Sequence, residues 1–239
     1  MSTYILIHGA WHGGWCWHKV TPLLEAHGHR VLTPDLPGLG NDPTPVTQIS
    51  MSAYRDSICA LLDAQDEPSI VIGHSMAGAV LNLVGDTSPD KVTTLVYLTA
   101  MLLENGESIF DAVTHDPQSL VLDNLLPSED GSWSDVKSEA LRDVFYANCS
   151  DADIIYARAR LKPQALSVLA EPIHVNDVNW GRIPRIYIEC LQDRAITAAQ
   201  QKRMYTNLPC REVLTLDTDH SPFFSTPELL AKQLLRITP

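Results

Sequence analysis

Short apolar runs rich in β-branched residues alternate with segments of helical periodicity along most of the chain. A strand covered on both faces shows a continuous apolar run, whereas a helix packed on a sheet shows apolar residues at i, i+3, i+4 and i+7. Strands are predicted at residues 4–8, 30–34, 69–74, 93–99, 185–190 and 212–216. Helices are predicted around 20–27, 51–64, 77–85 and 198–206, and from residue 226 onward. This alternation predicts an α/β fold, with a mostly parallel sheet of about six strands flanked by helices.

One block in the middle of the chain does not follow this alternation. Residues 102–181 carry scattered acids, prolines and tryptophans, with helix-like pieces at 136–147 and 152–160 and no evident strand. We therefore expect residues 102–181 to form a helical cap, inserted in a core of residues 1–101 and 182–239. Because open α/β sheets bind their ligands at the carboxyl ends of the strands, the cap should cover that edge.

The composition narrows the class of protein. The chain has 239 residues, 45% of them hydrophobic, and a formal net charge of -12. This fits one large domain and excludes a disordered chain, a collagen-like fibre and a coiled coil. The acidic balance argues against nucleic acid or an anionic membrane as a partner, since both need clustered cations. No apolar run approaches the roughly 18 residues of a membrane span, and no secretory signal is evident, so we expect a cytoplasmic protein.

The cysteine pattern and the lack of nucleotide motifs limit the chemistry further. The sequence has an odd number of cysteines, with no two of them two residues apart: Cys16, Cys59, Cys149, Cys190 and Cys210. Buried free thiols in a reducing compartment fit this pattern better than a disulfide framework or a zinc knuckle. We find no Gly-x-Gly-x-x-Gly motif, no Walker motif and no metal-ligand spacing, so neither a cofactor nor a metal is predicted.

The segment Gly73-His74-Ser75-Met76-Ala77-Gly78 lies between a predicted buried strand and a predicted helix. In a nucleophile elbow, a serine occupies a tight strand-to-helix turn, and small neighbours let the strand and helix approach closely. Ser75 would then stand at a helix N-terminus, where the helix dipole favours a developing anion. Ala77 stands where a second glycine is usual, a mild departure. The alternative is an ordinary strand–turn–helix junction with a capping serine.

A serine needs a neighbouring base to become a nucleophile, and His220 is the best candidate. It follows the last predicted strand in a loop that leads to the final helix. The order nucleophile, acid, histidine is found in one large class of serine hydrolases, and His220 fits the last place. His27, His29 and His115 have the pattern of surface or loop residues, and His74 is expected to point away from Ser75.

The acid that orients the histidine should follow the penultimate strand, where Asp193 lies. Asp217 and Asp219 are close to His220 in sequence, but neighbours in one loop rarely meet the ring nitrogen in line. Glu104, after the strand ending near residue 99, occupies a variant location and remains the alternative.

The oxyanion formed during acyl transfer needs preorganised N–H donors. One should be the backbone N–H of Met76, directly after the nucleophile. The other should come from the glycine-rich loop after the first strand, and Ala10 is the best candidate. His8 and His12 in that loop have i, i+4 spacing, but a loop does not place them on one face, so no metal pair is predicted.

Together these residues resemble the α/β-hydrolase fold superfamily, in particular the plant methylesterase and hydroxynitrile lyase group with its bacterial esterase relatives. The resemblance rests on segments 8–17, 23–31, 73–75 and 149–153, and on Asp193 and Asp219-His220. It implies a catalytic triad of Ser75, Asp193 and His220, an oxyanion hole at Ala10 and Met76, no cofactor, and a cap over a mostly apolar pocket. Homodimers are common in this group, so the resemblance also admits a homodimer.

Two positions separate the esterases of this group from the lyases. The lyases carry a threonine where this chain has Gly9, and a lysine directly after the catalytic histidine, where it has Ser221. The resemblance therefore implies a serine esterase acting on a small-molecule substrate, a methyl or aryl type of hydrophobic ester. Gly9, Trp11 and His74 are candidate pocket residues. A lyase, a slow-turnover ligand receptor, or a hydrolase of amides, lactones or C–C bonds stay open as alternatives.

Overall fold

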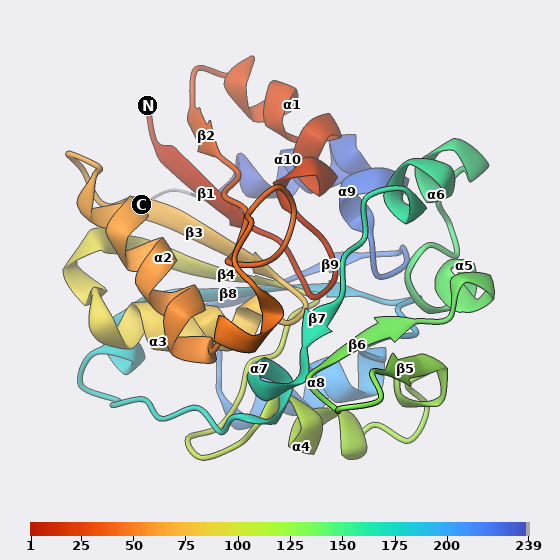
Figure 1. The fold of residues 1–239 in the computed structure, drawn as a ribbon. Helices are drawn as coiled ribbons and strands as arrows, with labels where there is room; N and C mark the ends of the chain where they lie inside the picture. The colour runs from red at the N-terminus through yellow and green to blue at the C-terminus, as the bar shows by residue number, and fades with distance from the viewer. Residues whose placement is uncertain (238–239) are drawn as a thin grey trace.

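The computed structural model describes residues 1–237 and contains a six-stranded, all-parallel sheet in the order β2-β1-β3-β4-β8-β9 (Figure 1). Its strands are β1 (Thr3–Ile7), β2 (Arg30–Leu32), β3 (Ser69–His74), β4 (Val92–Leu98), β8 (Arg185–Cys190) and β9 (Glu212–Leu216). All six lie where strands were predicted, which confirms the predicted fold class.

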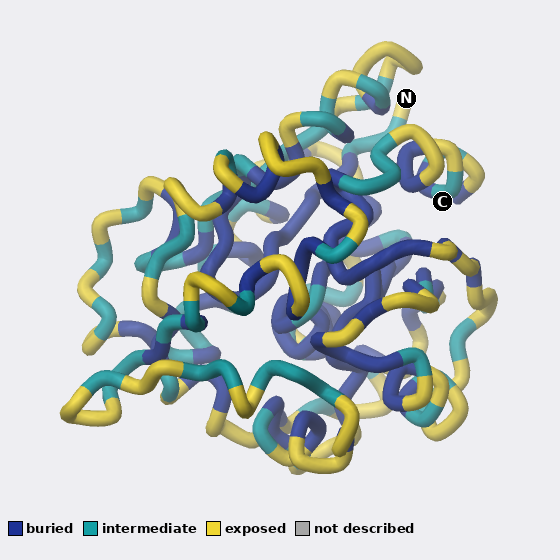
Figure 2. Tube along the Cα trace, turned by 90° about the vertical axis from the view of Figure 1, so that its right-hand side faces the viewer, coloured by how far each residue is buried: buried dark blue, intermediate teal, exposed yellow. Residues whose placement is uncertain are grey.

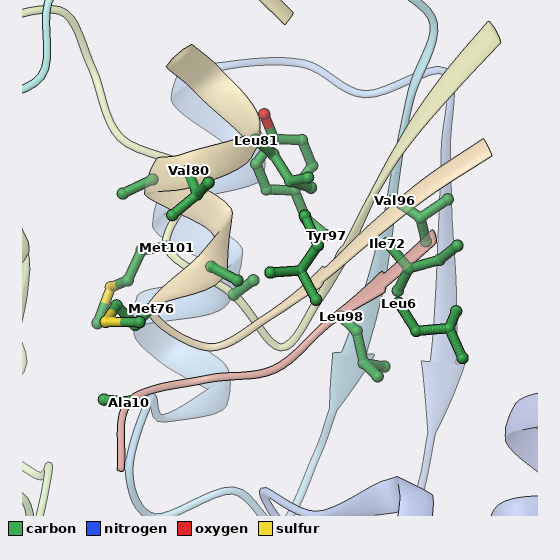
Figure 3. Close-up of a cluster of buried hydrophobic side chains, with 14 of the residues drawn as sticks. Leu6, Ala10, Ile72, Met76, Val80, Leu81, Val96, Tyr97, Leu98 and Met101 are labelled. Carbon is green, nitrogen blue, oxygen red and sulfur yellow. The ribbon is translucent and has the colours of Figure 1, made fainter. Parts of the chain in front are cut away.

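The continuous apolar runs of the central strands follow from burial on both faces. Every residue of β3 is buried, and so are four of the five residues of β1. Leu6, Ile72 and Val96 are register partners on β1, β3 and β4 and form one row of the core (Figure 3). Tyr97 lies on the opposite face beside Leu81 of the helix that follows β3. Figure 2 shows the buried chain concentrated in this sheet, with the exposed chain around it.

Helices cover both faces of the sheet. In Figure 1, α1 and α10 lie on one side, and α2 and α3 lie on the other. The helices of the core are α1 (Thr21–Glu25), α2 (Met51–Asp63), α3 (Ala77–Thr87), α8 (Ala198–Asn207), α9 (Pro222–Ser225) and α10 (Pro227–Leu234). Short 3₁₀ turns occupy Gly14–Lys19, Val46–Gln48, Pro89–Lys91, Leu122–Asn124, Ser138–Ala140 and Trp180–Arg182. None of the helices in residues 1–237 is long and apolar enough to cross a bilayer.

The segment between β4 and β8 is not purely helical, and the expectation that it lacks strands was wrong. It contains α4 (Ile109–Thr114), α5 (Leu141–Phe145), α6 (Asp151–Arg158) and α7 (Leu166–Ala170). It also contains a three-stranded antiparallel sheet of β5 (Leu125–Pro127), β6 (Trp133–Val136) and β7 (Gln164–Ala165). These strands are too short to show an alternating pattern, and β6 pairs with a strand from beyond α6, so no local signal reveals them. The helix predicted at 136–147 begins only at Leu141, because Val136 pairs with Leu125 in this sheet.

Candidate active site

Ser75 occupies a sharp turn between β3 and α3, with φ of 55°. Such a backbone conformation is unusual for a side chain other than glycine and marks a strained turn. The turn is tight because its glycines have no side chains. A Cβ on Gly73 would lie 2.8 Å from the Ala77 carbonyl oxygen, and one on Gly78 would lie 2.5 Å from that of Met101. The local geometry is therefore that of a nucleophile elbow.

The two loops that follow β8 and β9 bring Asp193 and His220 into contact. His220 Nδ1 lies 2.6 Å from Asp193 Oδ2, and the side chains are 1% and 0% exposed. A carboxylate accepts hydrogen bonds, so the Nδ1 proton is donated to Asp193 and Nε2 remains available to a second partner. This is the arrangement predicted for the acid and the base.

Asp193 is held by three further donors. Thr99 Oγ1 donates to Oδ2 at 2.5 Å, and the backbone N–H groups of Ala195 and Ile196 donate to Oδ1 at 2.6 and 2.9 Å. Thr99 directly follows β4 and has φ of 36°, an uncommon value for a β-branched residue. The sequence reasoning missed Thr99 as a site residue. Its position, a polar residue at the carboxyl end of a central strand, was the signal that could have found it.

The other acids considered for this role lie elsewhere. Glu104 is exposed and accepts a hydrogen bond from Asn207 Nδ2 at 2.8 Å. Asp217 is exposed and accepts from Gln192 Nε2 at 2.9 Å. Asp219 is buried, and its carboxylate accepts bonds from its own loop, α9 and the cap. Within residues 1–237, Asp193 is the one carboxylate bonded to the His220 ring.

His74 connects the loop that carries His220 with the turn that carries Ser75. Its Nε2–H donates to the His220 carbonyl at 2.8 Å, and the centroids of the two rings are 4.6 Å apart. Among the described residues, no hydrogen bond joins Ser75 Oγ to His220. Catalytic hydrogen bonds are often long without substrate and tighten only in the reacting complex. The contacts of His74 thus hold the His220 loop against the turn that carries Ser75.

The two predicted oxyanion donors lie beside Ser75. The N–H groups of Ala10 and Met76 donate to no acceptor within residues 1–237, although both residues are buried. Ala10, Met76 and Ser75 line the same cavity. Gly9 makes this approach possible, because a Cβ there would lie 2.9 Å from Ser75 Cβ. Two N–H groups without an acceptor, on residues that line one cavity with Ser75, are what an oxyanion site requires.

The cavity next to Ser75 is narrow, about 40 Å³, and almost wholly apolar. The core contributes Ala10, Trp11 and Met76, and the cap contributes aromatic and aliphatic side chains that include Phe110 and Phe145. Figure 3 shows Ala10, Met76 and Met101 close together at this end of α3. Ser75 is the one lining residue with a hydroxyl, amide or charged group among those described.

The three predicted pocket residues differ in whether they line this cavity. Trp11 lines the cavity, whereas Gly9 and His74 do not line it. His74 is fully buried behind the elbow, and Gly9 is wedged between His74 and Ser75. Phe145 was missed: its ring lies 5.5 Å from that of His220 and 5.6 Å from that of Trp11. It comes from the cap, where the sequence pattern assigned no pocket residues.

Three buried histidines surround this site and stay uncharged. Burial lowers the pKa of His8 to about 4 and that of His12 to about 3, and it lowers the pKa of His74 well below its ordinary value. Both ring nitrogens of His8 are occupied by backbone groups, Gly9 O and Leu36 N. In the part of the chain that the structure describes, no cluster of three or more His, Cys, Asp or Glu side chains could hold a metal ion.

Comparisons with known proteins agree with this geometry. Residues 4–233 match the sequence profile of the "Alpha/beta hydrolase family". The chain is 32% identical to Methylesterase 2 of Arabidopsis thaliana over 249 residues, which cover 98% of this chain and 95% of that protein.

Solved structures give the same result. Polyneuridine aldehyde esterase superposes with a TM-score of 0.91 at 26% identity over 100% of both chains. A pyrethroid hydrolase from Sphingobium faniae JZ-2 superposes with a TM-score of 0.87 at 31% identity over 98% of this chain and 96% of the other. The fold, the elbow and these matches together place the chain in the alpha/beta hydrolase family, in the group of the plant methylesterases and their bacterial esterase relatives.

Proposed function

We propose that the protein is a carboxylic ester hydrolase in which Ser75 is the nucleophile, His220 the base and Asp193 the orienting acid. The observation that carries this proposal is the 2.6 Å contact between His220 Nδ1 and Asp193 Oδ2 beside a serine in an elbow. The relatives support it, because their names describe a methylesterase, an esterase and a pyrethroid hydrolase.

The first half of the reaction acylates the enzyme. His220 Nε2 takes the Ser75 hydroxyl proton while Oγ attacks the ester carbonyl carbon. The carbonyl oxygen gains negative charge and accepts hydrogen bonds from the N–H groups of Ala10 and Met76. The C–O bond to the alcohol then breaks, and His220 gives its proton to the departing alkoxide. Met76 directly precedes α3, so the helix dipole also favours this charge.

The second half releases the acid. A water molecule enters the site, His220 Nε2 takes one of its protons, and the resulting hydroxide attacks the acyl carbon. The second oxyanion uses the same two N–H donors, and His220 returns the proton to Ser75 as the acyl–oxygen bond breaks. Asp193 holds the ring tautomer and stabilises the imidazolium during both halves.

The cavity favours small, neutral, hydrophobic esters. Apart from Ser75, its lining consists of apolar and aromatic side chains, and it contains no charged side chain among the described residues. A charged acyl group would lose its hydration there without gaining a partner. Methyl and aryl esters bring no such charge, which matches the substrate class expected from the sequence.

The proposal is tested with purified protein and 4-nitrophenyl butyrate, and with the 4-nitrophenyl monoester of succinic acid as a charged probe of similar length. We expect many turnovers of the first and about 100-fold or more lower kcat/KM for the second, since an unpaired buried charge costs several kcal/mol. Release of at most one equivalent of nitrophenol would favour a receptor. Benzaldehyde release from mandelonitrile, above buffer and Ser75→Ala controls, would favour a lyase.

A further inference from the structure

Ala10, the proposed oxyanion donor, is held on both sides by imidazole rings. His8 Nδ1–H donates to the Gly9 carbonyl at 2.8 Å, and His12 Nδ1–H donates to the Ala10 carbonyl at 2.7 Å. The Gly9 carbonyl and the Ala10 N–H belong to one peptide unit, which is planar. Two fixed carbonyls therefore fix the direction of the N–H between them.

His12 can hold the Ala10 carbonyl only in one of its two neutral tautomers. A carbonyl oxygen accepts hydrogen bonds and cannot donate, so the proton must be on Nδ1. Nε2 is then an acceptor, and the Tyr146 hydroxyl donates to it at 2.7 Å. His12 and Tyr146 are 1% and 0% exposed, and burial lowers the pKa of His12 to about 3, so the ring is neutral at ordinary pH.

Tyr146 is a residue of the cap that is anchored to the core on its C-terminal side. The Asn148 N–H donates to Asp219 Oδ2 at 2.8 Å, and Cys149 Sγ donates to the same oxygen at 3.4 Å. Asp219 directly precedes His220. The short cap segment 145–149 thus contacts both the loop that carries the base and, through His12, the loop that carries the oxyanion donor.

We infer that Tyr146 is a positioning residue for the oxyanion hole, which holds the His12 ring in the orientation whose Nδ1–H bonds the Ala10 carbonyl. The inference rests on the proposed function. Without the hydroxyl, the buried Nε2 acceptor of His12 has no donor, and the ring is no longer held on the side of the cap. The Ala10 N–H would then be held on one side only, by His8 through the Gly9 carbonyl, although no group that touches substrate has changed.

The test compares Tyr146→Phe with Tyr156→Phe. Both remove a hydroxyl from a cap tyrosine, but the Tyr156 hydroxyl has no hydrogen-bond partner within residues 1–237 and Tyr156 does not line the cavity. We expect Tyr146→Phe to lower kcat about tenfold with KM unchanged, less than the 10²–10³ that follows loss of an oxyanion donor. Affinity for an aryl trifluoromethyl ketone, which forms an oxyanion adduct, should fall by the same factor. Tyr156→Phe should change neither.

A second variant separates the effect transmitted through the His12 ring from simple loss of packing. His12→Asn keeps an N–H that can reach the Ala10 carbonyl but removes the acceptor for the Tyr146 hydroxyl. In the His12→Asn background, Tyr146→Phe should therefore have no further effect on kcat, so the two changes are non-additive. Additive losses would overturn the inference. Thermal unfolding of each variant shows whether the protein measured is folded.

The hydrogen bonds of the His12 ring are read by nitrogen NMR of histidine-labelled protein. Wild type should show a protonated Nδ1 and a hydrogen-bonded Nε2, and Tyr146→Phe should shift the Nε2 signal, because that nitrogen loses its donor. An unchanged His12 signal together with unchanged ketone affinity would overturn the inference while wild-type ester turnover left the proposed function standing. If the wild type hydrolyses no ester, the proposed function fails, and the inference fails with it.

Discussion

Ser75 separates two regions of opposite character. On one side, Asp193 accepts four hydrogen bonds, one of them from His220, and every donor is buried or backbone. On the other side, the cavity beside Ala10 and Trp11 is lined almost wholly by apolar side chains. The polar side is fixed in place by many directional contacts, whereas the apolar side imposes only shape and exclusion of water.

The difference indicates how this site divides its tasks. Directional bonds hold the groups whose position determines the rate, since small displacements of catalytic groups are costly. Non-directional contacts receive the substrate, so recognition there depends on size and polarity and tolerates variation in structure. Changes on the polar side should therefore alter kcat, and changes on the apolar side should alter the range of substrates.

The largest effect is expected from removing the Ser75 hydroxyl, which lies between the two regions. Ser75→Ala should lower ester turnover by about 10⁶-fold, the loss seen on removing the nucleophile of a comparable triad. The fold should be unchanged, as circular dichroism would show. A variant that kept more than about a tenth of wild-type kcat would exclude Ser75 as the nucleophile.

Next in size is the loss of the acid on the polar side. Asp193→Asn should lower kcat by about 10⁴-fold, because an amide favours the wrong His220 tautomer and does not stabilise the imidazolium. Glu104→Gln is the matched control, since Glu104 is exposed and bonded to Asn207. Measured kcat values in the reverse order would move the acid to Glu104.

The neutral histidines behind the polar side should make the fold sensitive to acid. Burial depresses the folded-state pKa of His8, His12 and His74, so below about pH 6.5 the unfolded chain binds protons that the native state does not. The free energy of unfolding should fall as pH falls from about 6.5 toward 4, by up to about 1.4 kcal/mol per pH unit for each of these histidines.

Urea unfolding at pH 7.5 and pH 5 measures this dependence. His12→Asn should reduce the loss of unfolding free energy by at most about 1.4 kcal/mol per pH unit, which is the contribution of one histidine. His115→Asn, at an exposed position, serves as the control. Equal slopes for wild type and His12→Asn would show that His12 does not stay neutral in the folded protein.

The smallest of these effects concerns a single hydrogen bond to Asp193. Thr99→Val removes the hydroxyl that donates to Oδ2 and should lower kcat/KM about tenfold, in line with the net strength of a hydrogen bond to a charged group. Thr99→Ser keeps the donor and should retain most of the activity. Thr94→Val is the control, because its buried hydroxyl has no hydrogen-bond partner. An equal loss in both valine variants would point to packing of β4 instead.

The core and its three proposed catalytic side chains could be predicted because parallel strands gather their carboxyl ends at one edge. Ser75, Asp193 and His220 each follow a strand that the apolar pattern reveals, so their proximity follows from chain order. Thr99 also ends such a strand, but its role depends on β4 and β8 being neighbours in the sheet, which strand order in sequence does not state.

The cap residues could not be predicted for a different reason. Phe145 and Tyr146 are placed by contacts with Trp11 and His12, more than 130 residues earlier in the chain. The cap strands pair in the same non-local way, with Trp133 opposite Ala165. Hydrophobic periodicity records only contacts within one element, so a region built from short elements and distant pairings has no periodic signal.

The missing side chain of Gly9 also bears on how new chemistry could evolve on this scaffold. A Cβ at this position would lie 2.9 Å from both Ser75 Cβ and His74 Nδ1, so the threonine expected of the lyases does not fit unless the elbow moves. A change to threonine at position 9 is therefore harmful unless a change that moves the elbow comes first, so the order of mutations matters and the position shows sign epistasis.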